Sequence, residues 1–447
     1  MTTTASLPPG PTLHPIHQGL RFAFRAASFF EECAHRYGDC FTLRLPVGVP
    51  VVMFTAPDAV REIFTGDEED LRAGAANVVL RPLLGPNSLL FLDGARHARE
   101  RRLMLPPFHG ERMLAYGDAM RTITDRAIER WPLGRPLAIQ PEMQAITLDV
   151  ILRTVFGLEG EELGRLRDLL RRWIGLGTNP LWLWPRLQVD LGALSPWGRL
   201  LRIRREIDTL LFAAIAQRRA AAAPERADVL SLLVAARDED GAPMSDEELR
   251  DEMMTLLVAG HETTATALAW AFHHVLADPD ILAALREELG LVVGAGPLSP
   301  THIGKLTYLD ATVKETLRLS PVLSEVGRRL ERPMRIGGQE LPAGIAVGPC
   351  IYLVHRRPDL WPDPERFDPT RFLGTRPSPY EFLPFGGGVR RCIGMAFALY
   401  EMKVVLAQVL LRLELRLAPG YRMKLVRRSI TLAPSRGMPV IAAPRAA

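Results

Sequence analysis

Residues 385–394 read Phe-Gly-Gly-Gly-Val-Arg-Arg-Cys-Ile-Gly, and they lead into a segment, 394–413, whose apolar residues recur at helical spacing. A thiol just before a helix N-terminus, here Cys392, has its thiolate favoured by the helix dipole and by free backbone N–H groups. The glycines let amides approach the sulfur, Gly394 leaves room above the first helical turn for a flat ligand, and Arg390 is placed to neutralise an acidic group on it. A glycine-rich loop that merely buries a structural cysteine would have the same glycine spacing. Spacing alone therefore does not separate the two interpretations.

The complete pattern F-x-x-G-x-R-x-C-x-G resembles the haem-binding loop of the cytochrome P-450 family. It is matched by five fixed positions within ten residues: Phe385, Gly388, Arg390, Cys392 and Gly394. The resemblance implies haem b as the cofactor and Cys392 as the proximal thiolate ligand to its iron, a ligation that favours O–O cleavage. It also implies the P-450 fold, mainly α with a small β-rich lobe and a long central helix.

The segment 246–277 predicts that central helix. Ser245 precedes it and Glu248 follows three residues later, which is the spacing of a capping box, and Pro279 marks its end. Its middle is apolar except for His-Glu-Thr-Thr at 261–264, and a helix that is apolar on most sides is buried. Four consecutive polar residues at the middle of a buried helix require an explanation.

The stretch Ala259-Gly-His-Glu-Thr-Thr264 resembles the oxygen-activating motif of the same family. The Thr263 hydroxyl can bond to the Ala259 carbonyl one turn back, and Gly260 tolerates the resulting bulge. Glu262 and Thr263 then form a carboxylate–alcohol pair suited to delivering protons to reduced dioxygen. A surface-facing polar patch is the commoner explanation for such residues in isolation, but the neighbouring cysteine motif argues against it.

Glu315 and Arg318 resemble the E-x-x-R pair of the family, with Arg371 as the third member of a structural triad that fixes the Cys392 loop. Taken alone, residues at i and i+3 form an ordinary helix-surface pair.

The propionates of haem are buried anions that need cationic partners. By resemblance these are His97 and Arg101, one turn apart, together with Arg328 and Arg390. His355 is a weaker candidate, since an ordinary surface histidine explains it as well.

By resemblance, four apolar stretches line the distal pocket: 78–91; 173–200; Leu256, Ala259 and Thr263 on the central helix; and 323–326. Trp182, Trp184 and Trp197 cluster in the second stretch. An apolar pocket predicts a hydrophobic substrate, such as a fatty acid, a terpenoid or a polyketide-like compound. The tryptophans are equally compatible with the packing of a mobile helix–loop–helix lid.

Length and composition exclude several classes of protein. The 447 residues are 47% hydrophobic and 24% charged, which excludes a disordered or collagen-like chain. Four cysteines without a C-x-x-C pair exclude a disulfide scaffold and predict a reduced, cytoplasmic protein. A net charge of +4 without long basic runs gives no support for a nucleic-acid partner.

The N-terminus lacks the charged and apolar regions of a signal peptide, and no apolar stretch reaches the roughly 18 residues of a transmembrane segment. Residues 1–15 are interpreted as a proline-rich, extended lead-in. Although the length permits three domains, the motifs must converge on one haem, so 1–447 is expected to form a single haem domain and a monomer.

Apolar periodicity predicts helices over 111–131, 144–155, 160–173, 197–219, 246–277, 280–289, 308–319 and 394–413. Strands are expected at 41–45 and 51–54, with short pieces between 327 and 354.

The expected activity is that of a bacterial-type monooxygenase that inserts one oxygen atom from O₂ into its substrate. Because no flavin- or NADPH-binding region fits in the remaining length, electrons must come from a ferredoxin or flavodoxin with its reductase. Such carriers are usually acidic, and they are expected to dock on a basic face formed by Arg101, Arg102, Arg391 and Lys403. The alternatives are a peroxygenase that uses H₂O₂, which typically lacks the acid–alcohol pair, and a non-enzymatic haem-thiolate sensor or carrier.

Overall fold

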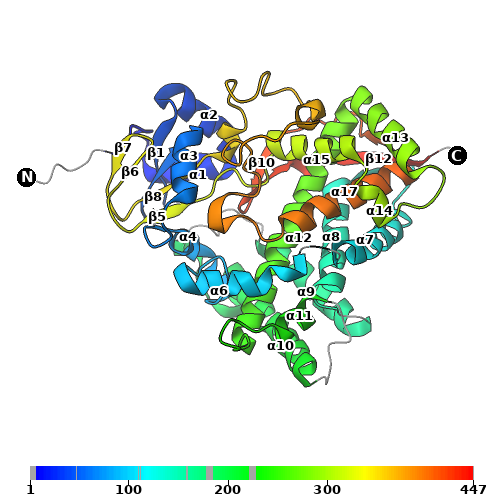
Figure 1. Ribbon diagram of the computed structural model, residues 1–447, viewed down its shortest axis with the longest axis horizontal. Coiled ribbons are helices and arrows are strands. Elements are labelled where there is room, and N and C mark those ends of the chain that lie inside the picture. Colours follow the sequence, from blue (N-terminus) through cyan, green and yellow to red (C-terminus); the bar gives the residue numbers. More distant parts are fainter. Residues whose placement is uncertain are drawn as a thin grey trace, which may run out of the picture.

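A computed structural model of the chain describes residues 7–46, 48–108, 110, 112–157, 160–177, 185–220 and 228–445. Strands β1 (Cys40–Arg44), β5 (Arg328–Leu330) and β8 (Ala346–Pro349) gather with helices α1 (Pro15–Phe24), α2 (Ala26–Tyr37) and α3 (Pro57–Thr65) at one side (Figure 1). Helices α7 (Arg112–Ile128), α13 (Pro279–Val293), α14 (Pro300–Ile303) and α17 (Met395–Arg412) lie at the other. Helices dominate and the sheets are small, so the predicted mainly α fold with a β-rich lobe is confirmed.

The helices are α1 (Pro15–Phe24), α2 (Ala26–Tyr37), α3 (Pro57–Thr65), α4 (Ala73–Asn77), α5 (Arg81–Leu84), α6 (Gly94–Met104), α7 (Arg112–Ile128), α8 (Ile139–Thr154), α9 (Gly160–Gly177), α10 (Pro196–Ala220), α11 (Val229–Ala235), α12 (Asp246–Ala277), α13 (Pro279–Val293), α14 (Pro300–Ile303), α15 (Thr307–Leu319), α16 (Ile351–Val354) and α17 (Met395–Arg412). The strands are β1 (Cys40–Arg44), β2 (Pro50–Phe54), β3 (Leu71–Arg72), β4 (Pro136–Ala138), β5 (Arg328–Leu330), β6 (Met334–Ile336), β7 (Gln339–Leu341), β8 (Ala346–Pro349), β9 (Leu413–Leu417), β10 (Leu425–Arg428), β11 (Thr431–Pro434) and β12 (Pro439–Pro444).

Helix α12 is the centre of the helical part, as the sequence predicted (Figure 1). The Ser245 side chain accepts from the Glu248 amide and the Glu248 carboxylate accepts from the Ser245 amide, so the capping box is present. Helices α8, α15 and α17 pack against α12. The Trp270 indole donates to the Leu432 carbonyl of β11 at 2.8 Å, which ties the buried helix to the β-hairpin β10–β11.

The largest sheet has the strand order β1-β2-β8-β5-β3, in which β2 and β8 are parallel and the other pairs are antiparallel. Apolar residues of α3 pack on one part of this sheet, and those of α2 pack on another. A second sheet, β4-β12-β9, and two hairpins complete the β structure of the described residues.

The expected lead-in has a structural role in its described part, which begins at residue 7. The Thr42 hydroxyl donates to the Pro8 carbonyl at 2.6 Å, and the Thr42 amide donates to the Pro9 carbonyl at 3.0 Å. This extended segment is therefore fastened along strand β1. Among the described helices, none combines the length and apolar character needed to cross a lipid bilayer.

Several elements of the structure were not among those predicted from sequence periodicity. Helix α6 reads GARHARERRLM and presents almost no apolar stripe, so the pattern for a helix is missing there. Helices α1 to α3 are short, and strand β9 follows directly on the last predicted helix. The sequences of α1 to α3 do carry an amphipathic pattern, so a local signal was present for these helices.

Candidate functional site

The Cys392 loop is closed on itself and pressed against helix α3. The Cys392 amide donates to the Phe385 carbonyl at 2.9 Å. Gly388 has a φ of +63°, and a Cβ added there would lie 2.0 Å from the Phe64 carbonyl oxygen. A side chain at Gly388 would therefore be excluded both by backbone conformation and by contact, which explains the fixed glycine of the motif.

The residue Cys392 has exposed surface. Its thiol group, however, is surrounded by protein atoms, and this burial raises the thiol pKa. The Gly394 amide, Arg101 and Arg391 lower that pKa, but burial outweighs them. The loop therefore contains groups that favour the thiolate, as expected, but their effect on the pKa is smaller than that of burial. A thiol bound to a metal ion, by contrast, is deprotonated. A Cβ added at Gly394 would meet nothing within 4 Å, so open space lies above the first turn of α17.

The middle of α12 also presents accessible surface inside the fold. Ala259 is exposed, whereas the helix is buried before it, from Leu249 to Leu257, and after it, from Thr264 to Phe272. Accessible atoms at the centre of a buried helix indicate an internal space next to them.

The predicted propionate ligands form a cluster of three arginines and one neutral histidine. Burial, together with the nearby charges of Arg390, Arg101 and Arg328, lowers the pKa of His97 to about 3. Burial and Arg390 likewise lower the pKa of Arg328 to about 10. Among the described residues, Arg328 has no carboxylate within ion-pair distance, and its guanidinium donates only to the adjacent Gly327 carbonyl, at 2.9 Å.

Two carboxylates that the sequence did not single out also belong to this cluster. Glu68 Oε1 lies 3.2 Å from His97 Nδ1 and 3.0 Å from Arg390 Nε, and Asp93 pairs with Arg390. Both residues are ordinary acidic loop residues in the sequence, so no pattern could have indicated them. The buried arginine without an acidic partner and the space above the cysteine loop together fit an anionic, flat group such as haem.

Glu262 and Thr263 differ in their surroundings. The Thr263 hydroxyl donates to the Ala259 carbonyl, as predicted. Glu262 Oε2 accepts from Gln144 Nε2 of helix α8 at 2.7 Å, and burial raises the pKa of this carboxyl. The predicted bulge at Gly260 is not seen, because α12 is continuous; a Cβ there would lie 2.7 Å from Ile151 Cδ1, so this glycine permits the close approach of α8.

The expected triad is assembled and completely buried at its centre. Arg318 and Glu315 make a two-pronged pair, with Nε to Oε2 at 2.7 Å and Nη2 to Oε1 at 2.8 Å. Arg371 Nε lies 3.5 Å from Glu315 Oε1, an ion-pair contact without a hydrogen bond. Arg318 also donates to the carbonyls of His355, Pro364 and Arg366 at 2.7, 2.8 and 3.2 Å.

Comparison with known proteins identifies the family of this chain. The family model described as Cytochrome P450 matches residues 8–439. The chain belongs to the cytochrome P450 family.

Among its relatives, the putative cytochrome P450 135B1 of Mycobacterium tuberculosis (strain ATCC 25618 / H37Rv) is 41% identical, covering 98% of this chain and 91% of the relative. The putative cytochrome P450 138 of the same strain is 39% identical, covering 94% of this chain and 95% of the relative. The structure of cyanobacterial CYP120A1, solved with retinoic acid bound, is similar with a TM-score of 0.88 and 29% identity, covering 99% of this chain and 100% of that one.

Membership makes this P450 an oxidoreductase of the haem-thiolate monooxygenase class, with haem b as its cofactor. P450s generally need a redox partner and act on hydrophobic substrates.

His355 of this P450 is not a propionate contact, which corrects the sequence-based expectation. Its side chain is fully buried, its Nδ1 lies 3.0 Å from the Arg318 carbonyl, and its Nε2 accepts from the Leu383 amide at 2.8 Å. Burial and the neighbouring arginines lower its pKa to about 3. Both ring nitrogens are thus used, and the neutral ring links helix α15 to the chain just before the cysteine loop.

The expected distal stretches are only partly apolar. Trp182 and Trp184 lie outside the described residues. Trp173 and Trp197 are buried in the helical core, which agrees better with packing of the helices around this segment than with a pocket wall. In the fourth stretch, Ser324 accepts from Arg427 at 2.8 Å, so a buried polar contact interrupts the apolar run.

The basic docking face predicted for this P450 is weaker than expected. Lys403 Nζ lies 2.9 Å from Asp310 and is largely buried, and Arg102 is paired with Glu239. Arg101 is half-buried and donates to the Arg391 carbonyl at 2.7 Å. Of the four expected cations, Arg391 alone is exposed without an ion pair to a described residue.

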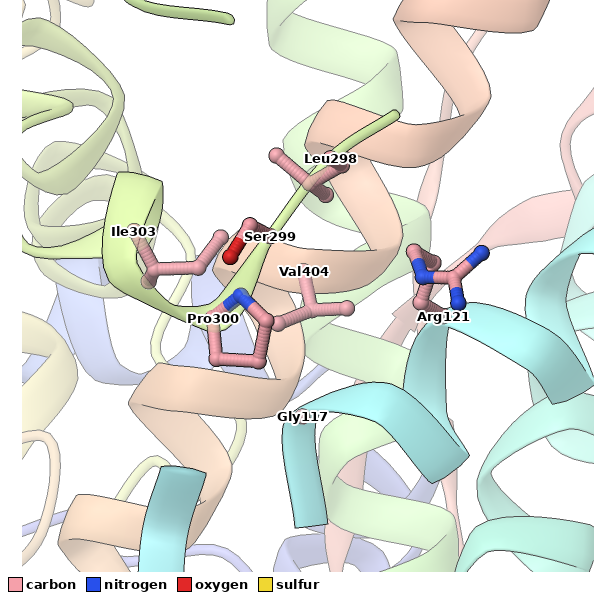
Figure 2. A pocket seen from close by; sticks show the side chains of 7 residues that line it. All are labelled: Gly117, Arg121, Leu298, Ser299, Pro300, Ile303 and Val404. Atoms are coloured by element: carbon pink, nitrogen blue, oxygen red, sulfur yellow. The ribbon is translucent and has the colours of Figure 1, made fainter. Parts of the chain in front are cut away.

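A small hollow lies where α7, α14 and α17 meet, lined by Gly117, Arg121, Leu298, Ser299, Pro300, Ile303 and Val404 (Figure 2). Its empty volume is about 150 Å³, but it is too narrow to admit a water molecule. None of the predicted site residues lines it, so it is a packing gap remote from the chemistry.

Proposed function

We propose that this P450 inserts one oxygen atom from O₂ into a fatty acid, a terpenoid or a polyketide-like compound, with electrons from a separate ferredoxin or flavodoxin and its reductase. The observation that carries the proposal is the accessible surface at Ala259 in the middle of α12, next to Glu262 and Thr263. The relative solved with retinoic acid, a hydrophobic carboxylic acid, supports a substrate of this kind.

Cys392 would ligate the haem iron, and His97, Arg101, Arg328 and Arg390 would hold the propionates. Phe385, Gly388 and Gly394 would shape the loop beneath the ring, while Ala259 and Gly260 would border its other face. When bound, the haem supplies the iron centre at which O₂ is reduced and cleaved. The triad of Glu315, Arg318 and Arg371 has a structural role: it fixes the chain that leads to the cysteine loop.

Glu262 and Thr263 would supply protons at the oxygen site. Burial raises the pKa of the Glu262 carboxyl, so it retains a proton to higher pH than an exposed glutamate does. The Thr263 hydroxyl, which donates to the Ala259 carbonyl, can turn to pass a proton onward. Retention of this pair favours O₂-driven chemistry over a peroxygenase and over a sensor without turnover.

A cytoplasmic location, a monomeric state and a single haem domain over 1–447 remain predictions from the sequence. We propose that an acidic electron carrier docks on the face that carries Arg391, where it would approach the cysteine loop. Charge reversal at Arg391 is expected to slow reduction and to weaken its salt dependence. Unchanged reduction kinetics would refute this docking site.

The central test is the absorption spectrum of the reduced, CO-bound holoprotein. We expect the red-shifted Soret band of thiolate ligation in the wild type and its loss in Cys392→His. A wild-type spectrum without the red shift would refute the thiolate assignment. Titration with lauric acid, retinoic acid, a monoterpene and a macrolide should then give a low-to-high spin shift with at least one class, and no response from any of them would refute the proposed substrate range.

A further inference from the structure

Helix α8 presents a row of polar side chains to the middle of α12. Three residues spaced four and three apart share one face of α8: Gln140, Gln144 and Thr147. Gln140 Nε2 lies 3.5 Å from Thr266 Oγ1, and the Thr147 hydroxyl lies 2.9 Å from His261 Nδ1 and 3.1 Å from the His261 carbonyl. Between these two contacts, Gln144 donates to Glu262 at 2.7 Å.

The amide of Gln144 is the hydrogen-bond donor that the structure gives to the Glu262 carboxyl. The second carboxyl oxygen, Oε1, is buried and has no partner among the described residues. The charge of Arg428, at the end of β10, is the other influence that lowers the pKa of this carboxyl. The Gln144 amide is therefore the one hydrogen bond from the described residues that orients this half-buried carboxyl.

The two helices are held together tightly at this level. The Cβ position of Gly260 lies 2.7 Å from Ile151 Cδ1, so no side chain separates α12 from α8 there. Thr147 fixes His261, the residue before Glu262, and the His261 ring is fully buried. Because the backbone on this side of Glu262 is anchored to α8, the Gln144 amide acts from a rigid frame.

We propose that Gln144 is a positioning residue for proton delivery: its amide holds the Glu262 carboxyl in one orientation on the face of α12 that packs against α8. The inference rests on the proposed roles of Glu262 and Thr263. It adds that the efficiency with which protons reach the oxygen site depends on a residue of α8 that touches neither substrate nor cofactor.

The matched variants are Gln144→Met and Gln140→Met. Methionine has nearly the shape of glutamine but no amide donor. Gln140 lies one turn away on the same face of α8, and its contact with Thr266 is longer and does not involve a carboxyl. Gln144→Leu serves as a second variant if Gln144→Met gives little folded holoprotein.

The first measurement is an infrared pH titration of the protonated carboxyl band in the holoprotein, with Glu262→Gln as the subtraction reference. A hydrogen bond to the ionised carboxyl favours that form, so its loss should move the Glu262 titration to higher pH in Gln144→Met. Gln140→Met should titrate as the wild type does. An unmoved titration in Gln144→Met, or an equal movement in both variants, would overturn the proposal.

The second measurement is product formed per electron consumed, with the substrate that gives the largest spin shift. Loss of a hydrogen bond to a charged group can lower the fraction of molecules whose Glu262 carboxyl is correctly oriented about tenfold. The product formed per electron consumed, called coupling below, should therefore fall by up to that factor in Gln144→Met. If Glu262→Gln leaves coupling unchanged, the proposed proton function itself is wrong. If Glu262→Gln lowers coupling and Gln144→Met does not, the role of Gln144 alone is wrong.

Discussion

Replacement of Arg318 by methionine removes the most highly connected buried cation of the described structure. Its guanidinium makes five hydrogen bonds: two to Glu315, and one each to the carbonyls of His355, Pro364 and Arg366. Arg318 and Glu315 are both fully buried. The substitution would leave a buried carboxylate whose remaining partners are the Asp368 amide, at 2.9 Å, and the more distant Arg371.

The expected cost follows from these contacts. Removing one partner of a buried ion pair costs about 3–5 kcal/mol. Each of the three hydrogen bonds to carbonyls that are lost adds its net contribution of about 0.5–1.5 kcal/mol. The total is about 4.5–9.5 kcal/mol, which approaches the whole free energy of unfolding of a typical domain, about 5–15 kcal/mol.

The assay is urea unfolding of the holoprotein, followed by tryptophan fluorescence and by the Soret band. Arg371→Met is the matched control, because its Nε makes a 3.5 Å ion-pair contact without a hydrogen bond to Glu315; a loss of about 1 kcal/mol is expected there. For Arg318→Met we expect little folded holoprotein. A variant that folds, retains haem and unfolds within about 1 kcal/mol of the wild type would refute the structural role given to this pair.

Three further predictions follow from the same structure. Gly388→Ala should yield protein with little bound haem, because the new methyl group would overlap the Phe64 carbonyl at a backbone position with positive φ; a normal haem content and Soret band would contradict this. His355 and His261 have pKa values of about 3 in the fold, against an ordinary 6.5, so below pH 6.5 the unfolded chain binds protons that the native state does not. The contribution of the two neutral rings to the free energy of unfolding should therefore be complete above pH 6.5 and fall by about 2 kcal/mol per histidine on going to pH 5. Urea midpoints measured above pH 6.5 and at pH 5 test this; equal midpoints would show that the rings accept protons in the fold. Arg328→Leu should raise the melting temperature of the apoprotein by relieving repulsion from Arg390, yet speed haem transfer to apomyoglobin about tenfold; unchanged haem transfer would mean that Arg328 holds no propionate.

The sequence predicted the elements whose signals are local. The bounds of α12 follow from a capping box at one end and a proline at the other, both of which act within a few residues. The Cys392 loop could be interpreted because each fixed residue of its motif has a local backbone or chemical reason. Periodicity gave no signal for helix α6, but the family resemblance placed His97 and Arg101 on an early helix, since recognition of a motif does not require periodicity.

The contacts that the sequence could not predict join residues that are far apart in the chain. His355 was misassigned because its partners are a backbone carbonyl and a backbone amide. Every residue type except proline has both groups, so the sequence does not indicate such contacts. Gln144 was overlooked for a related reason: a glutamine on a helix indicates nothing until the facing helix brings Glu262 to it. Lys403 was expected to be free because Asp310 lies 93 residues away.

The cations around Arg328 have a consequence for how the enzyme is made in the cell. Without the two carboxylates of its cofactor, the buried Arg328 has no ion-pair partner among the described residues and lies near the charge of Arg390, which Glu68 and Asp93 offset only in part. The empty protein therefore carries an electrostatic penalty that the loaded protein does not. Any ligand that binds only the native state raises stability with the logarithm of its free concentration. The amount of enzyme that accumulates should therefore follow the rate of haem synthesis, and chains made during iron shortage should be the first to be degraded.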